Sequence, residues 1–215
     1  GAKGSGGSSF TNTKSIALDG VDDFVSLNST TNLRPTDGEI TADGFSLSVW
    51  VNWTSDSSGI WANGGALETS NYWGLSFLVS ATGKAFIRKG DGGAPSSNAR
   101  SDASTAAGTI PSGVWTHIAF VLSGANKSTW KIYVNGVSET LTTAGTGGGV
   151  AYGGTAAIGS WATNSFNGKI DECSAYNTAL SASDVTTIYN SGVPNDLTGT
   201  SGLVSWWRCG DGDSA

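Results

Sequence analysis

The segment that most constrains the fold is Phe166–Gly192, which reads FNGKIDECSAYNTALSASDVTTIYNSG. It begins close to an Asn-Gly pair, a dipeptide typical of tight turns between strands. An alternating strand follows and carries the adjacent acids Asp171 and Glu172. Ser181 then opens a short helix, Ala182–Tyr189, with an acid at its third position and a glycine beyond its end. An acid-bearing strand followed by one capped helix is a narrow architectural signature.

The rest of the chain has the composition of an all-β protein. Glycine accounts for 32 of 215 residues, tryptophan for nine, and charged residues for only 13%. Glycine and small polar residues favour turns and pleated surfaces, and aromatic side chains supply the apolar area of a core. The net charge of −6 argues against nucleic-acid binding through a basic patch. The chain lacks a run of about 18 apolar residues, so no membrane insertion is predicted.

Strand signals recur along the chain between turn clusters. In FSLSVWVNW (45–53), apolar residues occupy every second position, as in a strand with one buried face. Asn135-Gly136 predicts a two-residue hairpin, and the strands on either side of Asp19-Gly20 are expected to pair as another. Two stretches poor in apolar residues, 91–109 and 142–154, are expected to be long loops. Further strands are expected at 15–18, 24–27, 73–80, 84–88, 115–122, 129–134, 137–141, 156–158, 169–176 and 203–208.

This pattern predicts three regions. Residues 1–14 are expected to be a flexible lead-in; no signal peptide is visible there, and an export signal could lie upstream or have been removed. Residues 15–192 form the predicted all-β domain. Residues 193–215 are expected to be a linker and a terminal strand that packs on the domain or leads to a following segment.

The chain has too few thiols and imidazoles for a structural zinc site. Cys173 and Cys209 are its two cysteines and His117 its single histidine, whereas structural zinc takes four such ligands. The residues alone leave two alternatives open, a disulfide or two buried thiols. His117 lies in the apolar strand WTHIAFVL and is expected to be a structural residue rather than a catalytic one.

Four segments resemble, in the family's order, the laminin-G-like, concanavalin A-like lectin/glucanase domains. They are IALDGVDDFVSL, FSLSVWVNW, VWTHIAFVLSGANKSTWKIYVNGV and FNGKIDECSAYNTALSASDVTTIYN, and they span residues 15–190. The resemblance implies an all-β fold, a two-sheet antiparallel jelly-roll sandwich with one curved face and the short helix near 182–189. LVSWWRCGDGD in addition resembles a segment beside such domains in marine phage structural proteins and bacterial surface proteins.

The resemblance also implies a metal site and a covalent link. The family commonly holds a structural calcium ion; carried over, Asp19 and Asp171 supply carboxylates and Gly44 a carbonyl, which are donors that calcium prefers. Without the ion, Asp19 would be a turn residue and Asp171 a surface acid. Cys173 and Cys209 both replace apolar residues of the family segments, and these paired departures favour a 173–209 disulfide.

Catalysis is not expected. The glucanase relatives carry E-x-D-x-E on one strand, where alternate acids share a face, and this spacing is absent here. Asp171 and Glu172 are adjacent, so they are expected to point to opposite faces of their strand. That arrangement does not suit the facing carboxylates that glycoside hydrolysis needs.

Aromatic side chains are the candidate binding groups, because sugar rings stack on them through their apolar faces. The candidates at strand ends or in glycine-rich turns are Trp61, Tyr72, Trp73 and Trp161. Core packing is the alternative role for each of them. Trp115 is expected in the core from its motif position, whereas Trp50 is expected to line the curved face.

These features predict a non-catalytic, lectin-like domain of a virion or extracellular surface structural protein, which serves assembly or decoration. Its expected partners are a glycan or host surface and other virion or surface proteins, including further copies of the chain. Nucleic acid and membrane insertion are excluded. The alternatives are a secreted carbohydrate-binding module of a larger enzyme and, with less support, a glycoside hydrolase.

Overall fold

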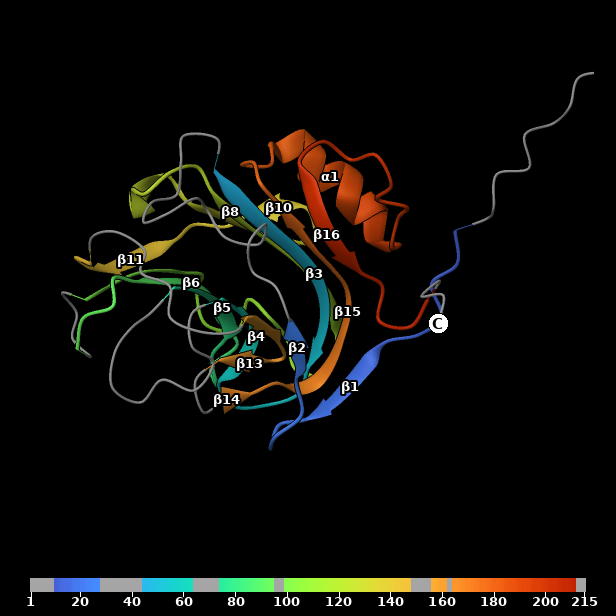
Figure 1. Cartoon of the computed structure of the whole chain (residues 1–215), viewed down its shortest axis with the longest axis horizontal. Coiled ribbons are helices and arrows are strands. Elements are labelled where there is room, and N and C mark those ends of the chain that lie inside the picture. Colours follow the sequence, from blue (N-terminus) through green and yellow to red (C-terminus); the bar gives the residue numbers. More distant parts are fainter. Residues whose placement is uncertain are drawn as a thin grey trace, which may run out of the picture.

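The computed structural model describes residues 10–27, 44–63, 74–94, 99–147, 156–161 and 164–211. In these ranges, two large antiparallel sheets stack on each other, and a two-stranded hairpin lies beside the second sheet (Figure 1). The prediction of an all-β, two-sheet sandwich is confirmed. A turn in this chain therefore connects either two neighbouring strands of one sheet or a strand of one sheet to a strand of the other.

Sheet A holds both ends of the described chain. In spatial order its strands are β1 (Ile16–Asp19), β15 (Asn167–Tyr176), β3 (Phe45–Trp53), β8 (Trp115–Leu122), β9 (Lys131–Val134) and β10 (Val137–Ser138). A further strand, β16 (Leu203–Trp207), pairs with the C-terminal half of β15. The terminal strand expected at 203–208 therefore packs on the domain itself.

Sheet B holds the middle of the chain. Its strands, in spatial order, are β11 (Thr142–Gly145), β7 (Arg100–Ser104), β6 (Ala85–Gly90), β5 (Leu75–Val79), β4 (Ser58–Ala62), β12 (Ala156–Ile158) and β2 (Val25–Leu27). The hairpin of β13 (Ser160–Trp161) and β14 (Asn164–Ser165) lies against β4. Two 3-10 turns are η1 (Lys127–Thr129) and η2 (Asn190–Gly192).

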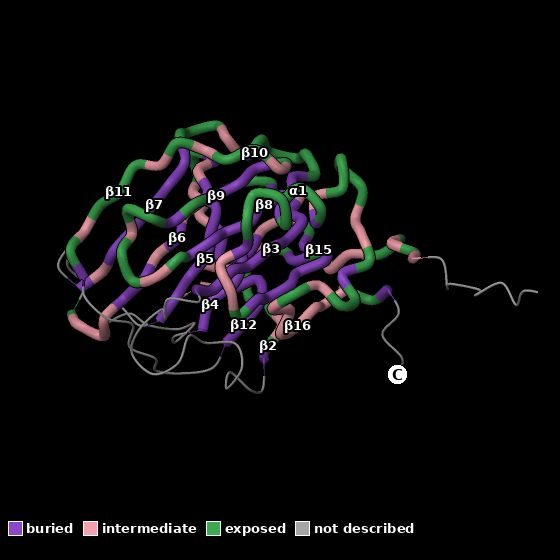
Figure 2. The backbone as a smooth tube through the Cα atoms, turned by 90° about the horizontal axis from the view of Figure 1, so that it is seen from above, coloured by how far each residue is buried: buried purple, intermediate pink, exposed green. Residues whose placement is uncertain are grey.

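The core lies between the two sheets. One face of β3 points inward with the residues Phe45, Leu47, Val49, Val51 and Trp53, all buried. Phe77 of sheet B meets Phe120 of sheet A with ring centroids 4.8 Å apart, so aromatic contacts join the sheets. Figure 2 shows buried strands through the centre and exposed connections around them. Each fully buried large apolar side chain contributes about 1.5–3 kcal/mol, which makes this layer the main source of stability.

One helix, α1 (Ala182–Tyr189), covers part of the outer face of sheet A (Figure 1). Its N-terminus carries the predicted cap: Ser181 accepts a hydrogen bond from the Asp184 amide, and the Asp184 side chain accepts one from the Ser181 amide. Val185 and Ile188 are its buried residues and pack in the cluster on sheet A. The predicted helix is thus confirmed. None of the helices in the described ranges is long and apolar enough to cross a bilayer.

Three expectations about strands and loops need correction. The strands flanking Asp19-Gly20 do not form a hairpin, because β1 pairs with β15 in sheet A and β2 pairs with β12 in sheet B. The DGVDD turn therefore crosses between sheets. The predicted loops 91–109 and 142–154 contain β7 and β11, which pair with each other at the edge of sheet B. Both strands consist of small, polar and charged residues, RSDAS in β7 and TTAG in β11, which explains why composition alone indicated loops.

Candidate functional site

The acid-bearing strand β15 has a divided edge. Its first half pairs with β1, up to Ile170 opposite Ile16, and its second half pairs with β16, from Cys173 opposite Trp207. Asp171 and Glu172 occupy the gap between the two partners. The chain segments before β1 and after β16 therefore meet at these two acids.

A β-bulge at this gap changes where Glu172 points. The register of β15 against β3 shifts between Asp171 and Ser174, and Glu172 has a positive φ of 47°. Both acids consequently reach one partner: Asn12 Nδ2 donates to Asp171 Oδ2 at 3.0 Å and to Glu172 Oε1 at 2.7 Å. The expectation that the two acids point to opposite faces is wrong, because simple alternation does not hold across a bulge.

Segments 10–15 and 206–211 hold each other together, and we call these contacts the terminal clamp. The Arg208 guanidinium carbon lies 4.6 Å from the ring centroid of Phe10 and 5.2 Å from that of Trp206. Arg208 also donates to the Thr11 carbonyl and lies 3.7 Å from Glu172 Oε1. Trp206 Nε1 donates to Glu172 Oε2. One arginine that packs beside two stacked rings thus compensates a buried carboxylate.

Asp211 completes the clamp from the C-terminal side. Its carboxylate accepts the Thr13 amide at 2.6 Å, the Thr13 hydroxyl at 2.9 Å and the Lys14 amide at 2.7 Å. Burial alone would raise the pKa of Asp211, but these hydrogen bonds outweigh it and lower that pKa. The side chain is therefore a carboxylate anchor for the backbone of residues 13 and 14.

The pKa values of the two acids of β15 are raised, whereas that of Asp211 is lowered. Burial raises the pKa of Asp171 to about 6, with the charge of Glu172 adding to the shift and the hydrogen bond from Asn12 opposing it. Burial also raises the pKa of Glu172, and hydrogen bonds from Asn12 and Trp206 oppose that change. At neutral pH the clamp therefore carries carboxylates whose charge burial disfavours.

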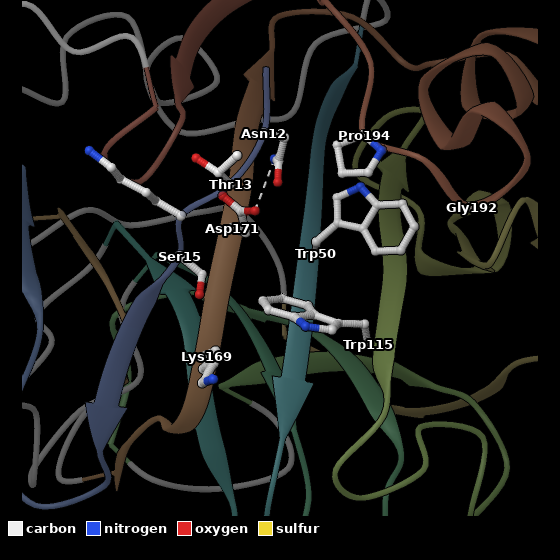
Figure 3. A pocket seen from close by; sticks show the side chains of 10 residues that line it. Asn12, Thr13, Ser15, Trp50, Trp115, Lys169, Asp171, Gly192 and Pro194 are labelled. Atoms are coloured by element: carbon white, nitrogen blue, oxygen red, sulfur yellow. Dashed lines mark hydrogen bonds between the residues drawn. The ribbon is translucent and has the colours of Figure 1, made fainter. Parts of the chain in front are cut away.

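The terminal clamp forms one wall of a pocket of about 360 Å³ on the outer face of sheet A, which we call the junction pocket (Figure 3). Its floor combines two neighbouring rows of the sheet, Lys169 and Trp115 in one row and Asp171 and Trp50 in the other. The residues completing its lining are Asn12, Thr13, Lys14, Ser15, Gly192 and Pro194. Trp115 is 39% exposed, so its predicted place in the core is wrong.

The Trp50 ring is held by packing from below and from the side. It stacks on Tyr189 with centroids 5.9 Å apart and lies 5.3 Å from His117. His117 is fully buried, and its Nε2 is 2.8 Å from Ser48 Oγ. Burial lowers the pKa of His117 to about 3, so it is neutral and acts as a packing residue. The structural role expected for His117 agrees with this placement.

The outer face of sheet B carries a second group of polar and aromatic side chains, which we call the guanidinium platform: Trp161, Arg88, Asp102 and Arg100. Arg88 binds Asp102 through two nitrogen–oxygen contacts of 3.0 and 3.2 Å. Arg100 Nε lies 3.2 Å from the same carboxylate. The Arg88 guanidinium carbon lies 4.8 Å from the Trp161 ring centroid. Trp161 is half-buried and the Arg100 side chain is 30% exposed, so the platform reaches solvent.

Of the four aromatic residues predicted to bind ligand, the structure describes two. Trp161 lies on the guanidinium platform. Trp61 is fully buried against Phe45 and Phe77, so it cannot offer a ring face to a ligand, and that prediction is corrected. Tyr72 and Trp73 lie outside the described residues.

The expected calcium ligands do not converge. Asp19 pairs with Asn167, four positions along β15 from Asp171, which corresponds to roughly 13 Å. Gly44 immediately precedes β3, whereas Asp171 pairs with Trp50, six positions farther along the chain, which is roughly 20 Å in a strand. The set Asp19, Gly44 and Asp171 therefore does not fit one ion.

Asp19 instead has neighbours in its own turn. It accepts the Val21 amide at 2.8 Å, as a turn residue does. Its ligand atoms and those of Asp22 and Asp23 lie within 4.8 Å of one another, and all three side chains are exposed. These carboxylates are hard donors, but exposed acids of this kind commonly occur without an ion.

No disulfide joins Cys173 and Cys209 in the structure. Cys173 points into the core between the sheets and is fully buried, which raises the pKa of its thiol well above the ordinary value. Cys209 lies beyond the end of β16, where its Sγ is 3.7 Å from the Trp207 carbonyl oxygen. The expected disulfide is therefore corrected to two thiols.

Several residues of these sites were not predicted. Asn12 and Asp211 lie near opposite ends of the sequence, and no local pattern predicts that Asn12 reaches Asp171 or that Asp211 reaches Thr13. Arg88 and Asp102 do follow a rule that could have found them, because they are opposite each other on neighbouring strands. That rule needs the strand at 100–104, which composition had indicated to be a loop.

A family model described as Laminin_G_3, the concanavalin A-like lectin/glucanases superfamily, matches residues 19–186. No curated protein sequence matches this chain significantly.

Solved structures share the fold at low identity. A suspected carbohydrate-binding protein from Bacteroides ovatus is 14% identical over 94% of this chain, with a TM-score of 0.54, and the match spans 53% of that protein. The CBM40 of a Ruminococcus gnavus sialidase, bound to α2,6-sialyllactose, is 11% identical over 82% of this chain and 97% of its own, with a TM-score of 0.57. A leech intramolecular trans-sialidase is 13% identical over 86% of this chain but only 28% of its own, with a TM-score of 0.56. At these identities the likeness concerns the fold.

Proposed function

Because the chain belongs to the concanavalin A-like lectin/glucanases superfamily, we propose that it is a non-catalytic domain that binds anionic sugars on the guanidinium platform of sheet B. The observation that carries the proposal is the contact of Arg88 and Arg100 with one carboxylate, Asp102, beside Trp161.

Charge at the platform favours an anionic ligand. Two guanidinium groups contact the single carboxylate of Asp102 on a chain whose net charge is −6, so basic groups gather here on an otherwise acidic protein. Guanidinium groups bind carboxylates through paired, charge-assisted hydrogen bonds. Arg100 is the more exposed of the two, with 30% of its side chain accessible against 14% for Arg88. Arg100 is therefore the residue positioned to meet a sugar carboxylate.

Trp161 supplies an apolar surface beside these charges. Arg88 packs on its ring and restrains it, and the β13–β14 hairpin fixes its backbone against β4. Binding sites for small ligands commonly combine an aromatic surface with a few placed polar groups. The sialyllactose-bound Ruminococcus gnavus module, which shares the fold, supports sialylated glycans as the first ligands to test.

The acids of this chain support a binding role rather than glycoside hydrolysis. The bulge brings Asp171 and Glu172 to one side, so the argument from alternation no longer excludes a carboxylate pair. Glu172, however, is engaged by Asn12, Trp206 and Arg208 and is not part of the junction pocket lining. Asp171 is thus the one carboxylate of that lining, whereas hydrolysis uses two.

We place this binding role at an extracellular or particle surface, where glycans are met. The virion context rested on the LVSWWR segment. In this chain Trp206 and Arg208 close the domain on its own N-terminal segment, so the segment needs no partner protein to explain it. A virion location therefore gains no separate support from the fold.

Isothermal titration with 3′-sialyllactose and 6′-sialyllactose tests the proposal. We expect saturable binding of at least one ligand by the unmodified chain. Arg100→Ala should weaken it about tenfold or more, the loss of one charge-assisted contact, and Trp161→Ala should weaken it similarly.

Val137→Ala, which changes an exposed side chain on β10 at the edge of sheet A, is the matched control and should leave sialyllactose affinity unchanged. The proposal is overturned if neither ligand binds saturably, or if both platform variants bind as well as the unmodified chain.

A further inference from the structure

The junction pocket has no part in the proposed sialoside binding, since it lies on the outer face of the other sheet. We propose that the junction pocket is a second saccharide site, which binds a neutral pyranose with Trp115 and Trp50 as its stacking surface and Asp171 as its hydroxyl-binding group.

Size and shape support a ring-sized ligand. The pocket volume of about 360 Å³ lies at the lower end of the range of roughly 300–1,000 Å³ typical of small-molecule sites. It is bounded by the sheet below, by residues 12–15 on one side and by Gly192 and Pro194 above (Figure 3). This space suits one or two sugar rings rather than an extended chain.

The two indoles differ in exposure, since Trp50 is buried and Trp115 is exposed. Trp50 is 7% exposed and is fixed by Tyr189 and His117, so it is a preorganised part of the floor. Trp115 is 39% exposed although it occupies the first position of a strand that is otherwise buried. A large apolar side chain exposed at the rim of a pocket gains free energy when a ligand covers it.

The polar groups of the pocket indicate a neutral ligand. Asp171 presents a carboxylate at the floor, and it is held in place by Asn12 at 3.0 Å and by the Glu172 amide at 2.8 Å. Lys14 and Lys169, both exposed, flank it on the lining. The carboxylate lies at the buried floor and the two lysines are exposed, so a group that reaches the floor between the indoles meets a hydrogen-bond acceptor. A neutral sugar offers hydroxyl groups that donate to the carboxylate and accept from the amines.

The terminal clamp explains why this pocket is ordered. Residues 12–15 precede β1, which begins at Ile16. Asp211 nevertheless fixes the amides of Thr13 and Lys14, and the carboxylates of β15 fix the side chain of Asn12. The wall of the pocket is therefore held in place by a segment almost 200 positions away in the sequence. Binding there requires no rearrangement of these groups, which lowers the entropic cost of association.

The test uses the chain labelled with ¹⁵N-tryptophan and a panel of neutral methyl glycosides: glucoside, galactoside, mannoside, xyloside and N-acetylglucosaminide, each as both anomers. Indole signals of Trp50 and Trp115 are assigned by single substitution. We expect at least one glycoside to shift both signals saturably at millimolar concentration. Trp115→Ala should lower that affinity tenfold or more, and Asp171→Asn severalfold.

Trp161→Ala is the matched control and should bind the same glycoside normally. Because Trp115 is exposed at the rim, its removal is expected to leave the melting temperature within a few degrees of the parent. The proposal is overturned if no glycoside shifts these indoles, if affinity is unchanged in Trp115→Ala, or if the shift belongs to Trp161. The last outcome assigns neutral sugars to the guanidinium platform, and sialoside binding there is measured separately.

Discussion

The outer faces of the two sheets use charged residues in opposite ways. On sheet A, Asp171, Glu172 and Asp211 together bind residues 12–14, and the guanidinium of Arg208 lies beside Glu172. On sheet B, the guanidinium groups of Arg88 and Arg100 both contact the carboxylate of Asp102, and Arg88 also packs on Trp161. We propose that the charges on sheet A serve mainly stability, whereas the charges on sheet B serve mainly ligand binding.

The largest expected effect is the difference in unfolding free energy between the Arg208→Ala and Arg100→Ala variants. Arg208→Ala removes the partner of the buried Glu172 and the contacts of the guanidinium with the Phe10 and Trp206 rings, so we expect a loss of about 2–4 kcal/mol in the free energy of unfolding. Arg100→Ala should cost less than about 1 kcal/mol, because Asp102 keeps Arg88 and the pair is part-exposed.

Chemical denaturation of both variants measures this difference. Equal losses in the two variants would mean that the clamp is not the stabilising feature that its contacts indicate.

A second prediction alters the platform without touching its side chains. A Cβ at Gly59 would lie 2.3 Å from the Trp161 amide nitrogen, so Gly59→Ala must displace the β13–β14 backbone. We expect a tenfold or greater loss of sialyllactose affinity and about 1–3 kcal/mol of stability.

Gly108→Ala is its control, because φ is +78° there but a Cβ would meet nothing within 4 Å. It should lose some stability and keep its affinity. If Gly59→Ala binds sialyllactose normally, Trp161 is not the stacking residue.

A third prediction concerns pH and the acids of β15. The pKa of Asp171 is about 6 in the folded chain against an ordinary 3.8, and the pKa of Glu172 is also raised. The folded state thus binds protons more readily, so stability should rise as pH falls from about 7 to about 4.5, on the order of 1 kcal/mol. Asp211, whose pKa is lowered, opposes this trend only as it protonates at lower pH.

Melting temperatures of the parent chain and Asp171→Asn at several pH values measure this effect. The variant should have a flatter profile. A parent chain that becomes less stable between pH 7 and pH 4.5 would contradict the assignment of buried charge to this face.

The smallest expected effect concerns calcium. Asp171 lies about four strand positions from Asp19, so the two cannot share an ion. Any shift of melting temperature produced by calcium or by a chelator should therefore be the same in Asp171→Asn as in the parent. A calcium response lost in Asp171→Asn but retained in Asp19→Asn would restore Asp171 as a ligand.

The sequence predicted the elements whose signals are local. Ser181 and Asp184 form a capping box that predicts the helix, and strict alternation of apolar residues predicts β3. The Asn135-Gly136 hairpin also forms as predicted, with Val134 opposite Val137. In each case, residues a few positions apart determine the structure.

The errors arose where distant segments decide the outcome. The bulge at Glu172 gives that side chain a direction that alternation cannot predict, and Trp115 is exposed although its motif suggested burial. Asp19-Gly20 has the composition of a hairpin turn, yet β1 and β2 find better partners in different sheets. Which sheet each strand joins depends on the packing of the whole sandwich, and the turn between the two strands does not determine it.

The candidate sites were predictable only where their residues have local sequence signals. Trp161 was identified from its glycine-rich surroundings, whereas Arg88 and Arg100 carry no distinctive spacing. Their common partner Asp102 becomes evident only when β6 and β7 are paired. The terminal clamp joins residues almost 200 positions apart, such as Thr13 and Asp211, and no local rule reaches that far.

The most direct test of the account is titration of the parent chain, Trp161→Ala and Arg100→Ala with 3′- and 6′-sialyllactose, with Val137→Ala measured in parallel. The account predicts saturable binding by the parent and by Val137→Ala, and a loss of about tenfold or more in both platform variants. Binding that survives in both platform variants, or that fails in the parent chain, would contradict the claim that sheet B carries the sugar site.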